Sequence, residues 1–265
     1  MLRRAARMLR IMAGILSISL QRDLAYRAEI FVRLGLSVLT SVGALVSLGA
    51  VYSHVHTLAG WTFGEAVLVA GVFMIVNGLL LTFVEPNLEW FAEKLRTGML
   101  DDVLVRPVSS MFLTSFATSR PWSLVDALIG VVVAGIGLRS LEGAVTVEGV
   151  LAGIFLIGVG LIAAWAIRLA CATVSFWALG LELSVFWYAP WTLGRYPVDA
   201  YGRVARTLLT YVLPVAFVST FPVRALTRGA HGELLLGGLV TAIVVCLAVA
   251  VLWRAALRRY TSATS

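Results

Sequence analysis

The sequence predicts an all-helical, polytopic membrane protein with about six transmembrane helices, forming one domain over residues 1–265. Only 13% of the residues are charged and 60% are hydrophobic, whereas a soluble domain carries about 25% charged residues. Several uncharged runs have the roughly 20 residues that a helix needs to cross the hydrocarbon core. The runs are continuous, unlike the short alternating strands of a membrane β-barrel. The expected crossings are residues 34–53, 66–84, 121–138, 149–168, 169–190 and 234–253.

The chain begins with a basic segment that we expect to lie on the membrane surface. Within residues 1–29, Arg3, Arg7 and Arg10 share one face of a helix and apolar residues gather on another, a pattern typical of an interfacial amphipathic helix. The apolar stretch 11–20 resembles part of a signal peptide, but no small-residue cleavage site follows it. By the positive-inside rule, this end is expected to be cytoplasmic.

The most polar part of the chain, residues 85–107, follows the second expected crossing. Carboxylates and basic side chains mix there, which predicts a cytoplasmic segment of helical character. Gly98 and the Arg106-Pro107 pair are expected to end its helices, because glycine and the residue before proline both favour helix termination.

The third crossing is less regular than the first two. Arg120, Pro121 and Asp126 interrupt its apolar stretch. We interpret residues 108–119 as an interfacial approach and residues 121–138 as the crossing itself.

The stretch after the fourth crossing allows two paths. In one, residues 169–190 cross and residues 195–222 form a broken re-entrant element on the outer side. In the other, the fourth helix extends to about Leu179, residues 195–206 stay cytoplasmic and residues 207–222 span. The charge distribution favours the second path. Both paths give about six crossings and place both termini in the cytoplasm.

No catalytic or metal-binding motif occurs in the sequence. It contains no phosphate loop G-x-x-x-x-G-K-[ST], no H-E-x-x-H and no G-x-S-x-G. Cys171 and Cys246 lie in apolar runs without histidine or acidic neighbours, so neither a disulfide nor a metal site is expected. The net charge of +7 comes largely from basic residues at the ends of apolar runs, so no nucleic-acid partner is expected. We expect no cofactor on this chain and no catalytic residue.

Four charged residues fall within or beside the expected crossings: Arg120, Asp126, Arg168 and Glu182. A charge at the bilayer centre costs about 2.5–3.5 kcal/mol even on lenient scales. They either line a polar path or lie near an interface and form pairs, for example Arg120 with Asp126. Their positions near expected helix ends favour pairing.

An aromatic cluster lies before the late proline-rich stretch. Its rings either line a path for an apolar substrate or form a belt at headgroup depth. The cluster comprises Phe186, Trp187, Tyr188 and Trp191.

Two stretches of the sequence carry recognisable motifs. Residues 96–107 read RTGMLDDVLVRP; residues 194–197 read GRYP and are followed by LLTYVLPVAF at 208–217 and by Pro222. In order and distance they are similar to the G-x-L-D-x-x-L-x-R-P and R-Y-P … L-P-V-A-F … P signatures of ABC-2 type permeases, specifically the bacterial ABC-2 family transporter proteins. Length and hydropathy agree along essentially the whole chain.

The resemblance implies a non-catalytic half-transporter that pairs with a second permease chain, identical or different, and with two separate ABC ATPase subunits that bind ATP and magnesium. It implies that about residues 86–104 form a coupling helix docking into the ATPase. The residues expected to carry this coupling are Glu89, Glu93, Arg96, Gly98, Leu100, Asp101, Leu104, Arg106 and Pro107.

The resemblance also favours the re-entrant path for residues 195–222, because helix-breaking prolines suit a broken element buried in protein. The residues assigned to this element or to a substrate path are Trp187, Trp191, Tyr196, Pro197, Pro214 and Phe217. The implied function is export of a hydrophobic or amphipathic substrate, such as a drug, lipid or secondary metabolite, across the bacterial cytoplasmic (inner) membrane. The alternative is an ATP-independent secondary transporter or channel, which is expected to carry polar groups at the bilayer midplane.

Overall fold

The computed structural model describes residues 14, 19, 27–89, 91–141, 143, 145–178 and 184–260. Apart from an isolated bridge between Leu58 and Trp61, the regular structure in these residues is helical, which confirms the all-helical fold class. The expected helix over residues 1–29 lies almost wholly outside them. The α-helices are α2 (Arg27–Tyr52), α3 (Phe63–Phe83), α4 (Glu85–Leu88), α5 (Phe91–Arg96), α6 (Asp101–Leu104), α7 (Ser110–Phe116), α8 (Leu124–Arg139), α9 (Val147–Thr173), α10 (Ser184–Thr192), α11 (Arg203–Thr207), α12 (Thr220–Arg228) and α13 (Gly232–Arg259).

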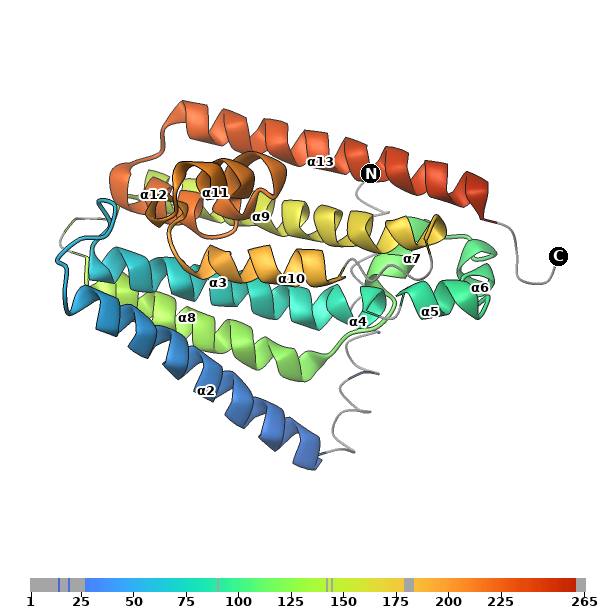
Figure 1. The fold of residues 1–265 in the computed structure, drawn as a ribbon, viewed down its shortest axis with the longest axis horizontal. Coiled ribbons are helices and arrows are strands. Elements are labelled where there is room, and N and C mark those ends of the chain that lie inside the picture. The colour runs from blue at the N-terminus through green and yellow to red at the C-terminus, as the bar shows by residue number, and fades with distance from the viewer. Residues whose placement is uncertain are drawn as a thin grey trace.

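Five of the described helical stretches are long and apolar enough to cross a membrane. They follow the long axis of the molecule, and the short helices gather toward its two ends (Figure 1). The chain is therefore a multi-pass membrane protein, as its hydropathy predicts. The five stretches are Leu34–Tyr52, Phe63–Phe83, Pro121–Arg139, Val147–Phe176 and Gly232–Arg259.

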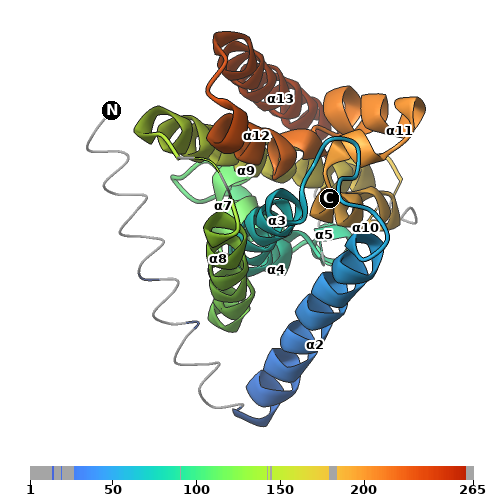
Figure 2. The ribbon, with the colours of Figure 1, turned by 90° about the vertical axis from the view of Figure 1, so that its left-hand side faces the viewer.

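Helix α3 lies at the centre of the bundle (Figure 2) and is largely buried. It begins with a capping box, in which the Thr62 hydroxyl accepts from the backbone N–H of Glu65 and the Glu65 carboxylate accepts from that of Thr62. Against α8 the backbones nearly touch: a Cβ on Gly71 would lie 2.3 Å from the backbone nitrogen of Ala134. Only glycine fits there, and small residues at such contacts are typical of packed membrane helices.

Helix α9 uses small residues in the same way, against the segment that includes α12. A Cβ on Gly149 would lie 3.1 Å from the Ala225 carbonyl oxygen, and one on Gly160 would lie 2.5 Å from that of Phe217. These glycines therefore serve packing within the chain. They hold the late proline-rich segment onto the bundle.

The boundary expected between a fourth crossing at 149–168 and a fifth at 169–190 is corrected. Helix α9 runs through Arg168 to Thr173 and continues as the 3₁₀ turn η2 (Val174–Phe176), whereas α10 has nine residues. The helix continues because the Arg168 charge is neutralised by a buried carboxylate, so a charge in an apolar run is no end signal here.

The chain between residues 193 and 219 is broken into short pieces. These are the 3₁₀ turns η3 (Leu193–Arg195), η4 (Val198–Ala200) and η6 (Val215–Phe217), helix α11, and the π turn η5 (Leu208–Val212). The second path extends the fourth helix to about Leu179, which agrees with α9 and η2 continuing to Phe176. Its span over residues 207–222 is wrong, since the helical stretch ends at Val212 and Pro214 lies in the following turn.

The short elements define two ends of the bundle (Figure 1). Helices α4 to α7 and the last turns of α13 lie at one end, which we call the coupling end. The loop between α2 and α3, the start of α9, and helix α12 lie at the other, which we call the opposite end.

Candidate functional site

The coupling end is fixed to the bundle by a buried ion pair. Glu85 of α4 accepts two hydrogen bonds from Nε of Arg168 in α9, at 2.9 and 3.1 Å, and their side chains are only 5% and 4% exposed. Tyr188 of α10 donates to the same carboxylate at 3.0 Å. One carboxylate therefore connects three elements. Arg168 stands out in the sequence as a charge in an apolar run, but its partner lies 83 residues away along the chain and could not be predicted.

A second attachment is the side chain of Asn87. Its Nδ2 donates to the carbonyls of Phe83 and Thr118, at 2.8 and 2.9 Å, and its Oδ1 accepts from the backbone N–H and hydroxyl of Thr118. Every donor of this buried amide is therefore used. The arrangement ties the start of the polar segment to the turn before α8.

The expected pair between Arg120 and Asp126 is not formed. Arg120 instead pairs with Glu89 at 2.5 Å, and Asp126 accepts a hydrogen bond from the Ser37 hydroxyl on α2. The reason is geometric, because Arg120 lies in the turn that packs against α4 while Asp126 is already on α8. Each residue thus joins separate segments. Glu182 lies outside the described residues.

Aromatic rings connect the coupling end to the ends of α9 and α13. Phe91 of α5 lies 5.7 Å from Phe176 and 6.0 Å from Trp253, measured between ring centroids, and Phe176 lies 5.9 Å from Tyr260. Such separations suit edge or offset packing. The Trp253 indole also donates to the Ser110 hydroxyl at 3.2 Å. Helix α5 therefore packs against the ends of two long helices.

Burial shifts the pKa of two titratable groups in this region. Desolvation lowers the pKa of Lys94, whose Nζ donates to the Asn87 carbonyl at 3.1 Å. Burial, together with the neighbouring Asp101 carboxylate, raises the pKa of Tyr260 to about 12. Asp101 thus faces the C-terminal end of α13.

The segment from α5 to α7 presents a mixed apolar and charged surface. Leu104 and Val105 are 37% and 82% exposed, and the neighbouring Arg106 and Pro107 are also exposed. Leu100, by contrast, is only 3% exposed and packs in the core. Leu100 is one of the expected coupling residues, but it supports this surface and is not part of it.

Three further residues that were expected to carry coupling, Gly98, Glu93 and Arg96, shape this surface. Gly98 has a φ of +73°, the left-handed conformation that ends α5 as expected. Glu93 and Arg96, one turn apart on α5, form a partly exposed ion pair at 2.8 Å. The expected single coupling helix is instead divided into α4, α5 and α6, and Gly98 breaks it between α5 and α6.

Trp187 and Trp191 lie inside the bundle. Their rings are stacked with centroids 4.7 Å apart, they are 3% and 5% exposed, and the Trp191 indole donates to Asn77 of α3 at 2.8 Å. Both are core residues of this chain. Within the chain they neither line an open path nor form an interface belt.

The other residues assigned to the broken element are also packed. Pro197, Pro214 and Phe217 are buried, and Tyr196 packs against the contact between α2 and α3. The Ser219 hydroxyl donates to the Gly194 carbonyl at 2.6 Å. These contacts fix the broken element to the helices on either side.

The opposite end contains a different charge cluster, centred on Asp199. Its carboxylate accepts from the Trp61 indole at 3.0 Å, pairs with Arg206 at 2.9 Å and also pairs with Arg224. Arg228 lies over the Trp61 ring, 4.5 Å from its centroid. This cluster could not be predicted from the sequence, since nothing in the spacing of its members signals it.

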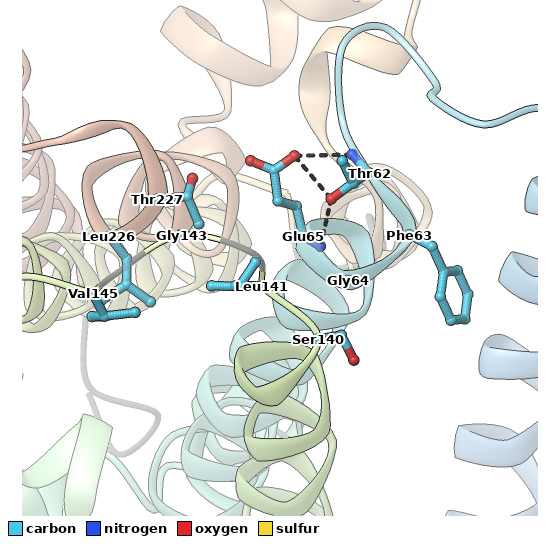
Figure 3. A pocket seen from close by; sticks show the side chains of 10 residues that line it. All are labelled: Thr62, Phe63, Gly64, Glu65, Ser140, Leu141, Gly143, Val145, Leu226 and Thr227. Atoms are coloured by element: carbon cyan, nitrogen blue, oxygen red, sulfur yellow. Dashed lines mark hydrogen bonds between the residues drawn. The ribbon is translucent and has the colours of Figure 1, made fainter.

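A cavity of about 400 Å³ lies nearby, between the start of α3, the end of α8 and the end of α12 (Figure 3). Its one carboxylate, Glu65, is directed at Thr62, with which it forms the capping box. Arg228 lies 3.6 Å from the same carboxylate. The Glu65 carboxylate in this cavity therefore caps helix α3. Within the described part of the chain, no cluster of three or more His, Cys, Asp or Glu could hold a metal ion.

Five helices of membrane-spanning length, with a polar segment at one end, define a multi-pass membrane protein. A family model described as "ABC-2 family transporter protein" matches residues 38–264, so the chain belongs to that family. No curated protein and no solved structure matches the chain. The family match confirms the resemblance drawn from the motifs at 96–107 and 194–222.

Proposed function

We propose that this chain is the permease subunit of an ABC exporter and that separate ATPase subunits bind ATP and magnesium and drive it. The observation that carries the proposal is the exposed surface around Leu104 and Val105 on a segment that buried contacts fix to the bundle. A partner that pushes on such a surface moves α9 and α13 as well, so the chain can convert partner motion into a change of the membrane helices.

The surface has the composition of a docking site. Apolar side chains of Met99, Leu104 and Val105 are exposed beside the charged Arg96 and Arg106. An apolar centre with a charged rim is typical of protein interfaces. The segment lies beyond the spanning helices, at the end that we place in the cytoplasm together with both termini.

We propose a hydrophobic or amphipathic substrate. The described charges within the spanning helices lie mostly toward helix ends, and Arg168 is paired. An ion-coupled transporter is expected to carry polar groups at the midplane, and among the described residues no unpaired charge lies there. An apolar cavity of about 270 Å³, lined by residues that include Leu79, Phe83 and Trp165, opens between α3, α7 and α9.

A second permease, identical or different, completes the transporter in this proposal. Helix α2 supports it: Phe31, Leu39 and Val46 are 72%, 67% and 64% exposed, whereas Ala44, Leu45 and Leu48 pack on α3 and α8. That exposed face is available to lipid or to the partner. We place the assembly in the bacterial cytoplasmic membrane.

The test compares two matched double variants. Val105→Asp with Arg106→Glu alters the coupling end, and Val147→Asp with Arg139→Glu makes the same chemical change on exposed residues of the opposite end; the two valines are 82% and 78% exposed. We expect only the first variant to lose ATP hydrolysis that co-purifies with the permease, and ATP-dependent substrate movement in vesicles. Unchanged hydrolysis and movement in the first variant would contradict the docking role.

A further inference from the structure

The broken segment at the opposite end encloses a cavity of about 530 Å³ with a basic lining. Arg203 and Arg206 of α11 and Arg224 of α12 all line it. Arginine guanidinium groups bind phosphate with several donors each. The cavity therefore presents the chemistry of an anion site.

The charges of this cavity are not balanced by the residues that the structure describes. Asp199 pairs with both Arg206 and Arg224, and Arg203 has no ion pair with any residue that the structure describes. Three guanidinium groups thus face a single carboxylate, which leaves two positive charges uncompensated. Arg224 is further held by the rings of Phe221 and Trp61, so the more exposed Arg203 and Arg206 are the available donors.

The helical stretch over residues 203–212 is amphipathic. Arg203 and Arg206 line the cavity, whereas the apolar Val204, Leu208 and Val212 recur every four positions outside its lining, and Tyr211 lines the cavity beside them. Such a stretch suits the boundary between headgroups and acyl chains. The exposed apolar residues are Val204 at 75%, Leu208 at 47%, Tyr211 at 81% and Val212 at 63%.

The position of the cavity along the bundle places it near the membrane boundary. Asp199, beside its lining residue Val198, binds the indole of Trp61, which lies in the loop just before the spanning helix α3. Arginine side chains at this depth can contact a lipid phosphate. The leaflet is the one away from the coupling end.

We propose that this cavity binds the phosphate headgroup of an anionic phospholipid, whose acyl chains lie along the face formed by Val204, Leu208, Tyr211 and Val212. The site differs from the docking surface at the coupling end and does not depend on the direction or energy source of transport. A bound lipid would hold α11 against α12, with Arg203 and Arg206 contacting its phosphate.

The test is calorimetric titration of the purified full-length protein in detergent with short-chain phosphatidylglycerol. Phosphatidylcholine of the same chain length and inorganic phosphate are titrated in parallel. We expect phosphatidylglycerol to bind more tightly than either, and Arg203→Gln to weaken it about five- to tenfold. Because Arg203 makes no ion pair within the described chain, this variant is expected to keep the thermal unfolding temperature of the parent.

Arg139→Gln is the matched control, since Arg139 is an exposed arginine at the same end that does not line the cavity. It is expected to leave phosphatidylglycerol binding unchanged. Equal binding of the two lipids, or equal weakening by both variants, would overturn the proposal. Inorganic phosphate binding as tightly as phosphatidylglycerol would overturn the lipid assignment in favour of a free-anion site.

Discussion

At the coupling end Glu85 and Arg168 form one pair with side chains 5% and 4% exposed, whereas at the opposite end Asp199 is shared by Arg206 and Arg224, which are 54% and 25% exposed. In the first arrangement, the charge of Glu85 is balanced by that of Arg168. The second leaves positive charge directed at a cavity. Balanced, buried charge fixes helices to each other, and unbalanced, partly hydrated charge remains available to a ligand.

The packing around the two clusters follows the same division. Around Glu85, a tyrosine hydroxyl completes the carboxylate's hydrogen bonds. Around Asp199, exposed aromatic and aliphatic side chains of the neighbouring α11 and η5 face outward. We therefore expect substitutions in the Glu85 cluster to act mainly on stability, and those in the Asp199 cluster to act on stability less and on ligand binding more.

The largest effect is expected from Arg168→Met. It leaves the Glu85 carboxylate buried without its cation, and breaking a buried pair from one side costs about 3–5 kcal/mol. Thermal unfolding of the detergent-purified variant, followed by the fraction that stays monodisperse, measures the loss.

The double variant Glu85→Leu with Arg168→Met sharpens this result. Replacing a buried pair by apolar residues of similar size is often neutral, so most of the lost stability is expected to return. A double variant as unstable as Arg168→Met alone would show that the pair is needed for more than charge balance.

Asn87→Ala is expected to come second, with a loss of about 2–3 kcal/mol. It leaves the backbone N–H and carbonyl of Thr118 without their partner, and each buried unsatisfied group costs about 1–3 kcal/mol. Asn77→Ala is the control on the preceding helix, since Asn77 accepts one hydrogen bond, from Trp191. Chemical unfolding should show a clearly larger loss of stability for Asn87→Ala than for Asn77→Ala. The reverse order would contradict the attachment assigned to Asn87.

The spanning helices could be predicted because their signal is local. A run such as 66–84 has the length and apolarity that lipid requires, and α3 occupies Phe63–Phe83. The helix end at Gly98 could likewise be predicted, since a glycine after a helical run favours the left-handed conformation that the structure has there. The family motifs were local as well.

The contacts between distant segments could not be predicted. Hydropathy reports Arg168 as a charge in an apolar run but contains nothing about Glu85, so a helix end was inferred where a pair exists. The expected pairing of Arg120 with Asp126 relied on nearness in sequence, whereas the fold brings Glu89 to Arg120. The glycine contact of α3 with α8 was not predicted, although Gly64, Gly71 and Gly78 recur every seven residues and lie against Ser140, Ala134 and Ala127 in turn.

Asp199→Asn tests the opposite end, where a smaller loss of about 1–2 kcal/mol is expected. The partners Arg206 and Arg224 are partly exposed and regain water, so the unpaired charges cost less than they would in the core. Removing the single carboxylate also raises the positive charge of the cavity. The variant should therefore be less stable yet bind phosphatidylglycerol more tightly, and weaker binding would contradict the charge argument.

Arg96→Ala is expected to change stability least. The pair of Arg96 with Glu93 is exposed to solvent, and exposed pairs gain little from their Coulomb attraction because water screens it. The unfolding temperature should stay that of the parent. Because Arg96 lies at the rim of the docking surface, the same variant should reduce the ATP hydrolysis that co-purifies with the permease, while Arg258→Ala on the exposed end of α13 should not. If Arg96→Ala unfolded the protein as Arg168→Met does, the coupling end would rely on exposed charge, and the contrast with its buried pair would fail.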